Sequence, residues 1–220
     1  MMFVKFFLAL LLVSSNWTLP PLPERQGLQG KLETRLESYT VIADNFPQAL
    51  TKIAAEFEIP MGIEWVRTPA TLRKVERTWQ RSTVHQVVAS LVTSQPGYDF
   101  TIRNAVAHVS YRGALTDNSS FLNQRIGKFE AKNEFVGMVS YRLRELLKPI
   151  VGTPIPGEPG VGMAGSIATG AGDQRVSFRL VNATVREILD KLSLAADFKI
   201  WIVTYREDRT LTRNGFRRVE

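Results

Sequence analysis

The chain has 220 residues, of which 44% are hydrophobic, 22% charged and 10% aromatic, and its formal net charge is +7. This length provides enough core for one or two domains, and this composition excludes a wholly disordered chain. The lack of cysteine excludes a disulfide framework, a thiolate metal site and a lipid-modified cysteine.

The N-terminus has the pattern of a secretory signal peptide. Lys5 precedes an apolar run at residues 6–13, and small residues follow at Ser14 and Ser15. A membrane-spanning helix needs about 20 apolar residues, so this run is too short for one. We predict a signal peptide at residues 1–15 and an exported protein without a transmembrane segment after cleavage. A buried N-terminal helix is the alternative.

Residues 36–112 alternate between strand and helix patterns after a proline-rich linker at 16–35. Thr83 and Gln86 have the spacing of a capping box, which predicts a helix start. Strands are expected at residues 39–43, 62–66, 75–80, 98–103 and 106–111, and buried helix positions at Leu50, Ile53, Ala54 and Phe57 and at Val84, Val87, Val88 and Leu91.

Residues 128–213 repeat this order after a polar linker at 113–127. Thr184 and Glu187 have the spacing of another capping box. Strands are expected at residues 129–134, 176–180 and 198–202, buried helix positions at Val139, Leu143, Leu146 and Leu147 and at Val185, Ile188, Leu189 and Leu192, a polar turn at Glu207 and Asp208, and a basic tail at 214–220.

The two halves align with an offset of 101 residues at the helices, which matches Thr83 to Thr184, and with an offset of 100 at the strands that follow, which matches Tyr98 to Phe198. We predict an α+β fold of two tandem small modules, each with two helices packed on its own small mixed sheet in βαββαβ order. A single sheet through both halves would refute this repeat. A chance likeness between two capped amphipathic helices is the alternative. His85 and Arg186, placed on outer helix faces, are expected to contribute little to stability.

The first module resembles a known family of exported domains. Residues 39–50, a strand pattern followed by Ala49 and Leu50, are similar to the opening of secretin and TonB short N-terminal (STN-like) domains. The helix after Thr83 and the strands at 98–111 resemble the rest of that domain. The resemblance covers residues 36–112 almost throughout and the second half mainly at 176–205. It implies a periplasmic module for protein contacts in outer-membrane secretion or receptor machinery. Channel or receptor function is not implied, because too few residues follow 205.

Residues 160–165 read Gly-Val-Gly-Met-Ala-Gly, which is the spelling of a dinucleotide-binding fingerprint. That motif requires a preceding strand and a following helix, whereas these residues lie inside a Gly/Pro-rich insertion at 151–174. We therefore expect no nucleotide site. The insertion is interpreted as a solvent-exposed loop or, alternatively, as a loop that contacts a partner or a membrane through Val161, Met163 and Ile167.

No residue set predicts catalysis, a cofactor or a metal. His85 and His108 are the only histidines, and zinc would need both together with a carboxylate. No Gly-x-Ser-x-Gly segment occurs. Candidate acid–base carboxylates are Glu56, Glu58, Glu64 and Glu76, and Trp65, Trp79 and Trp201 are expected in the core, with sugar stacking as the alternative. Binding residues are not identified at this level.

The sequence favours a non-enzymatic protein–protein interaction module of the periplasm, either free or associated with the outer membrane. It would be an accessory of outer-membrane secretion or TonB-type receptor machinery, with an envelope protein as partner and an exposed strand edge as one means of binding. The alternative is a binder of anionic envelope polymer, such as peptidoglycan or polysaccharide. A hydrolase without a readable motif is a third hypothesis. Nucleic acid is not expected, because the positive charges are spread along the chain.

Overall fold

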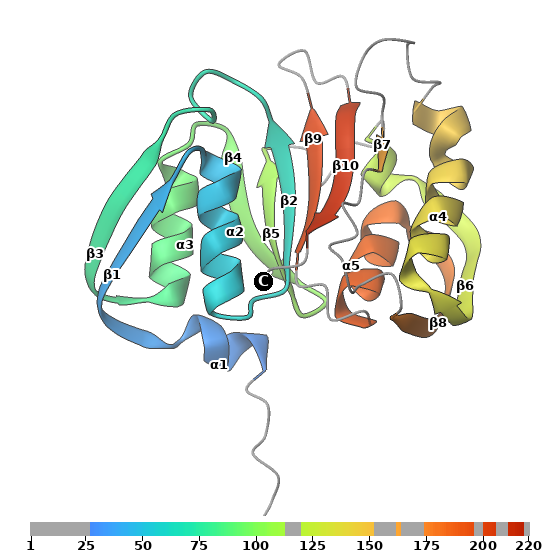
Figure 1. Cartoon of the computed structure of the whole chain (residues 1–220), viewed down its shortest axis with the longest axis horizontal. Coiled ribbons are helices and arrows are strands. Elements are labelled where there is room, and N and C mark those ends of the chain that lie inside the picture. Colours follow the sequence, from blue (N-terminus) through green and yellow to red (C-terminus); the bar gives the residue numbers. More distant parts are fainter. Residues whose placement is uncertain are drawn as a thin grey trace, which may run out of the picture.

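The structure, a computed structural model, describes residues 27–112, 120–151, 162–163, 174–195, 200–205 and 211–217 (Figure 1). Helices combine with mixed sheets, so the predicted α+β class is confirmed. The predicted signal peptide, most of the insertion and the predicted turn at Glu207 and Asp208 lie outside the described residues.

Regular elements follow one order in both halves of the chain. The first half contains α1 (Leu28–Leu32), β1 (Arg35–Ala43), α2 (Phe46–Glu56), β2 (Met61–Val66), β3 (Val75–Thr83), α3 (Val84–Thr93), β4 (Tyr98–Arg103) and β5 (Val106–Tyr111). The second half contains η1 (Phe121–Asn123), β6 (Arg125–Phe135), α4 (Val136–Val151), β7 (Gly162–Met163), β8 (Arg175–Thr184), α5 (Val185–Ala195), β9 (Ile200–Tyr205) and β10 (Leu211–Arg217). The helix α1 and the start of β6 fall inside predicted linkers, and β10 includes residues 214–217 of the predicted tail.

Side chains at the helix starts explain where the helices begin. The Asn45 side chain accepts a hydrogen bond from the Gln48 backbone N–H at 3.0 Å at the start of α2. Thr83 and Gln86 form the predicted capping box of α3. At α5, the Thr184 N–H donates to Glu187 Oε2 at 2.7 Å and the Glu187 N–H donates to Thr184 Oγ1 at 3.2 Å. These bonds satisfy backbone donors that a helix start leaves without partners.

Strand pairing within the two halves follows one pattern. The pairs β1–β3 and β6–β8 are antiparallel. The hairpins β4–β5 and β9–β10 are antiparallel, and a further strand pairs in parallel with the second strand of each, β2 with β5 and β7 with β10. Each half therefore contributes three strands to the central sheet, in the orders β4-β5-β2 and β9-β10-β7.

The two sets of three strands are joined into one six-stranded sheet. The strand β2 pairs in parallel with β9, from Met61 opposite Ile200 to Val66 opposite Tyr205. The expectation of a separate sheet in each half is therefore wrong. Both strands are largely buried, and each uses an edge that would otherwise leave backbone groups without partners.

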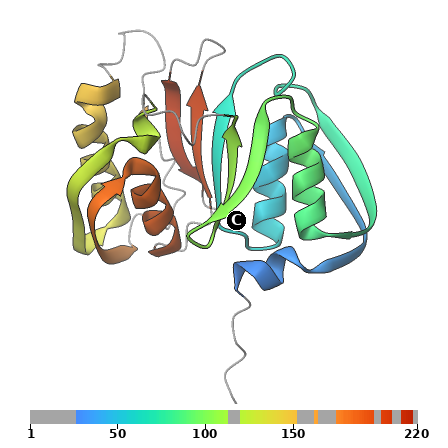
Figure 2. The same cartoon turned by 180° about the vertical axis from the view of Figure 1, so that it is seen from behind.

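The second half is turned over relative to the first. The strand β9 runs parallel to β2, whereas its counterpart β4 runs in the opposite direction to β2. A half-turn about an axis that lies in the plane of the sheet and perpendicular to the strands reverses strand direction and also exchanges the two faces of the sheet. Figures 1 and 2 show this exchange, with α2 and α3 on one side of the sheet and α4 and α5 on the other.

The two paired strands contribute differently to the hydrophobic cores, because β2 packs in the first core whereas alternation along β9 places its residues in both. Met61 and Ile63 of β2 and Ile200 of β9 pack with the helices of the first half. Trp201 and Val203 of β9 belong to the core of the second half. The predicted helix stripes are buried as expected, with two exceptions: Phe57 is only half-buried against the first core, and Leu146 is 46% exposed. Leu146 lies three residues after the buried Leu143, but its side chain is on the outer side of α4.

Candidate functional site

The joint between the halves contains a buried ion pair. Glu64 on β2 is 1% exposed and Arg186 on α5 is 5% exposed, and Arg186 Nη1 lies 2.5 Å from Glu64 Oε1. Burial raises the pKa of the Glu64 carboxyl, and the nearby Arg186 guanidinium offsets part of this effect, with a smaller contribution from His108. The placement of Arg186 on an outer helix face is therefore wrong, because its side chain is buried and pairs with Glu64 of β2.

A second polar group lies beside this pair under α5. The Trp201 indole N–H donates to Asp190 Oδ1 at 2.8 Å, and His108 Nε2 lies 3.2 Å from Asp190 Oδ2 without hydrogen-bond geometry. Ser110 follows His108 on the same face of β5, and its hydroxyl has no partner among the described residues. His108 and Ser110 are 0% and 1% exposed, so a dissolved substrate has no access to them in this conformation.

Gly62 allows the two strands to approach at the joint. A Cβ atom at this position would lie 2.3 Å from Cζ2 of the Trp201 ring. Any larger residue would therefore displace the indole, which packs over this part of β2. Gly62 and Glu64 point to the same face of β2 and meet side chains of the second half, Trp201 and Arg186.

The surface on α3 and β4 is the counterpart of this joint in the first half. The structure extends the offset of 101 residues to these strands in place of the expected 100, because Phe100 faces the core of its half as Trp201 does, so His85 corresponds to Arg186 and Phe100 to Trp201. The geometry agrees, because the His85 ring lies 5.4 Å from the Phe100 ring and Arg186 Cζ lies 6.0 Å from the Trp201 ring. The contrast lies in the covering strand. The β9 edge is covered by β2, whereas no described strand pairs with the outer edge of β4.

The outer edge of β4 presents backbone groups and apolar side chains together. Asn104 and Ala105 form a two-residue turn with positive φ values of 50° and 59°, so the flanking pair Arg103–Val106 exchanges hydrogen bonds. Alternation then directs the N–H and C=O groups of Phe100 and Ile102 outward. Phe100 is half-buried and Ile102 is 42% exposed, and His85 is exposed beside them. We call His85, Phe100 and Ile102 with this backbone edge the β4 edge surface.

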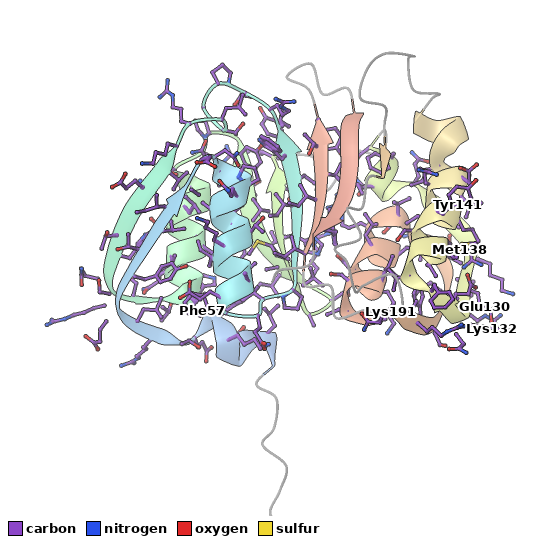
Figure 3. All side chains as sticks on the ribbon, in the orientation of Figure 1. Phe57, Glu130, Lys132, Met138, Tyr141 and Lys191 are labelled. Carbon is purple, nitrogen blue, oxygen red and sulfur yellow. The ribbon has the colours of Figure 1, made fainter. Side chains whose placement is uncertain are left out.

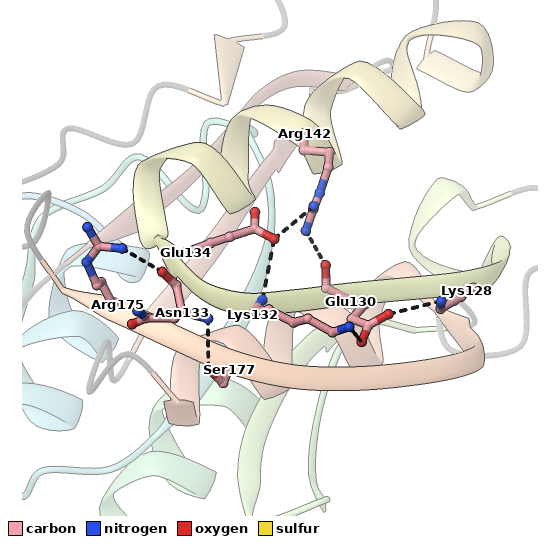
Figure 4. A network of polar contacts seen from close by, with 8 residues as sticks. All are labelled: Lys128, Glu130, Lys132, Asn133, Glu134, Arg142, Arg175 and Ser177. Carbon is pink, nitrogen blue, oxygen red and sulfur yellow. Dashed lines mark hydrogen bonds and ion pairs between the residues drawn. The ribbon is translucent and has the colours of Figure 1, made fainter.

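Charged residues on β6 and α4 form a closed network (Figure 4). Glu130 accepts from Lys128 at 3.0 Å and Lys132 at 3.1 Å, and these hydrogen bonds lower the pKa of the exposed Glu130 carboxyl to about 2. Arg142 bonds to Glu134 at 3.0 Å and to the backbone carbonyl of Glu130. The network borders a shallow pocket of about 350 Å³. Because the charges largely pair with one another, the pocket offers little net charge to a ligand.

A basic pocket lies between the start of β3 and the end of α3. It has a volume of about 470 Å³ and is lined in part by Arg73, Lys74, Arg77 and Gln95. Lys74 pairs with the exposed Glu76 at 3.2 Å, and Arg77 donates to the backbone carbonyl of Ser90 at 3.3 Å. An excess of cations over anions makes this pocket suitable for an anionic group.

An apolar strip on α4 is a further exposed surface. Met138 is 60% exposed and Tyr141 is 51% exposed, and Figure 3 shows both pointing away from the body of the protein. Leu146 is also exposed, but it lies five residues after Tyr141 and therefore on another side of α4, beside Arg142. Arg144 covers part of the strip, with its guanidinium carbon 4.8 Å from the Tyr141 ring.

The candidate residues from the sequence do not assemble into an acid–base pair. Glu56 accepts from the Tyr39 hydroxyl at 2.9 Å, and Glu58 pairs with Lys31 at 3.3 Å. Among the described residues no group of three or more histidine or acidic side chains is arranged to hold a metal ion. Residues 160–165 are described only at Gly162 and Met163, which form β7.

The tryptophans serve packing, as expected. The indoles of Trp65 and Trp79 donate to Thr71 at 3.0 Å and to Ser90 at 3.2 Å, and both residues are half-buried against the first core. Trp201 is 1% exposed. Sugar stacking on Trp201 would therefore require the joint to open.

Comparisons of the chain with family models, with curated proteins and with solved structures found no match. Within the part of the chain that the structure describes, none of the helices has the length and apolar character needed to cross a membrane.

Proposed function

We propose that this chain is an exported, non-enzymatic interaction module that holds an extended segment of a partner protein along β4. One observation carries the proposal. The counterpart edge β9 accepts a strand, β2, beside a helix side chain and an aromatic ring, and β4 presents the same arrangement while no described strand pairs with its outer edge. Strand addition to a sheet edge is a common mode of peptide recognition.

The buried polar residues support a structural role for the joint rather than catalysis. Arg186 pairs with Glu64 across the two halves, and Asp190, which accepts from Trp201, lies 3.2 Å from His108 of the first half, so the charged groups hold the two halves together. Export to the periplasm rests on the N-terminal signal pattern, and a role beside outer-membrane secretion or receptor machinery rests on the resemblance to STN-like domains.

A pair of variants tests the proposal through the backbone edge. Ile102→Pro removes an outward N–H, which an edge strand tolerates, and Ile102→Thr keeps that N–H while reducing the apolar surface. Envelope proteins captured by the mature chain should include one that Ile102→Pro loses and Ile102→Thr retains. Both variants must show wild-type thermal unfolding. If all captured partners bind Ile102→Pro as well as wild type, the β4 edge surface is not the binding site.

The basic pocket supports binding of an anionic envelope polymer as a second candidate function. Arg73, Lys74 and Arg77 would then meet carboxylate or phosphate groups of the polymer. Binding of soluble peptidoglycan or acidic polysaccharide should weaken steeply as salt rises, and the double variant Arg73→Ser with Lys74→Ser should abolish it. Binding that is unchanged by salt and by this variant would exclude the pocket.

A further inference from the structure

The joint between the halves specifies the chemistry of a strand that fits such an edge. The strand β2 runs parallel to β9 and places Gly62 opposite Trp201 and Glu64 opposite Val203. Gly62 is required because the Trp201 ring occupies the space of a side chain. Glu64 lies two residues later on the same face and reaches Arg186 from the adjoining helix.

The β4 edge surface has the corresponding groups in the corresponding places. With the offset of 101 residues, Trp201 corresponds to Phe100, Val203 to Ile102 and Arg186 to His85. His85 lies against Phe100, so its ring is held beside the edge rather than free in solvent. Asp99, the acidic residue of β4, pairs with Arg112 at 3.6 Å and points to the opposite face of the sheet. It therefore does not compete for His85.

Resting on the proposed function, we infer that the partner segment runs parallel to β4 and has a small residue opposite Phe100. Two residues later it carries a carboxylate, which binds His85. Glycine is the expected small residue by correspondence with Gly62, over which the Trp201 ring lies where β2 pairs with β9. The resulting pattern is x-Gly-x-Glu or x-Gly-x-Asp in an extended segment, as in Met61-Gly62-Ile63-Glu64.

The occupant is a different protein rather than a second copy of this chain. The counterpart of β2 in the second half is β7, at the far end of the sheet, so copies could in principle join β7 to β4 head to tail. However, Gly162 is followed two residues later by Ala164, which carries no carboxylate for His85. The chain's own free edge therefore lacks the group that the β4 edge surface selects.

A peptide with the sequence of residues 60–67 is the probe, and the mature chain is the receptor. Amide hydrogen exchange by NMR should show protection of Phe100 and Ile102 on peptide addition, and a spin label on the peptide N-terminus should broaden signals near Tyr98 rather than near Arg103. A peptide with Gly62→Val should bind about tenfold or more weakly because of the clash with the ring. A peptide with Glu64→Gln should bind about fivefold more weakly, because an exposed ion pair contributes at most about 1 kcal/mol to the binding free energy.

Charge exchange at position 85 is the matched control. His85→Glu should bind the wild-type peptide weakly and should recover binding of a peptide with Glu64→Lys, whereas His85→Lys should retain the wild-type preference. If the peptides with Gly62→Val and Glu64→Gln protect the amides of β4 as well as the wild-type peptide does, this inference is wrong, although the proposal of strand addition still stands. Loss of all protection at β4, with partner capture unaffected by Ile102→Pro, would overturn both. Self-association that Ile102→Pro abolishes would identify a second copy as the occupant and would refute the present choice.

Discussion

Replacing Arg186 by alanine should strongly destabilise the protein, because it leaves Glu64 buried without a partner. Arg186 is 5% exposed and Glu64 is 1% exposed, so water cannot replace the lost guanidinium. Breaking a buried ion pair on one side costs about 3–5 kcal/mol. A domain has a free energy of unfolding of only about 5–15 kcal/mol, so the variant should lose a large part of its stability.

Urea denaturation of the mature chain, followed by tryptophan fluorescence, measures this loss. The double variant Glu64→Leu with Arg186→Leu is the control, because replacing both charges by apolar groups is often neutral or stabilising. It should therefore be more stable than Arg186→Ala alone. A loss below about 0.5 kcal/mol in Arg186→Ala, the value for an exposed side chain, would refute the placement of Arg186 in a buried joint.

The same variant should show a pH dependence with a definite sign. Burial already raises the pKa of the Glu64 carboxyl, and removing Arg186 removes the main effect that opposes this rise. A carboxyl with a raised folded-state pKa favours folding at low pH, and this contribution is lost as pH rises through the folded-state pKa. The stability gap between wild type and Arg186→Ala should therefore be largest near neutral pH and should shrink on acidification toward the ordinary pKa of about 4.3. A gap that widens on acidification would contradict the reasoning.

Three further outcomes follow from the packing. Leu91→Ala and Leu192→Ala should each cost about 2–5 kcal/mol in urea denaturation, and probes in both halves should report one transition, because β9 contributes to both cores and pairs with β2 of the first half. Two separate transitions would contradict a cooperative joint. Gly62→Ala should cost about 1–3 kcal/mol in thermal unfolding because its Cβ would meet the Trp201 ring, and wild-type stability would show that the ring can move freely. Thr83→Ala should cost about 1 kcal/mol through the lost cap of α3, and Thr83→Ser, which keeps the hydroxyl, should cost less.

The features that sequence predicted well are local. The capping box at Thr83 and Gln86 depends on residues three positions apart, and the stripe through Val84 and Leu91 depends on helical spacing alone. The turn at Asn104 follows from residues that tolerate positive φ. In each of these cases the physical cause lies within one element or one turn, so it can be recognised from residues that are neighbours in the sequence.

The joint could not be predicted in the same way, because it depends on pairing between segments far apart in the chain. Arg186 follows a helix cap and has the appearance of an exposed residue, and its contact with Glu64 lies 122 positions away. One signal was present. Glu64 lies in a strand that is otherwise apolar or glycine, and an acidic residue in such a strand indicates a buried partner. That signal predicts a partner but does not identify it.

The single sheet through both halves refutes the predicted repeat of two separate modules, although the likeness between the halves remains. Both halves keep the same order of elements and the same pairings. The second half is turned over, so that β2 of the first half pairs with β9, the outer strand of the hairpin of the second half. This union covers β2 and β9 and leaves β4 at one end of the sheet. Edge strands are commonly protected by proline, lysine or a covering element, yet β4 has neither residue and presents Phe100 and Ile102. An edge of this composition is an aggregation hazard unless it has an occupant, which is the reason to expect one at β4.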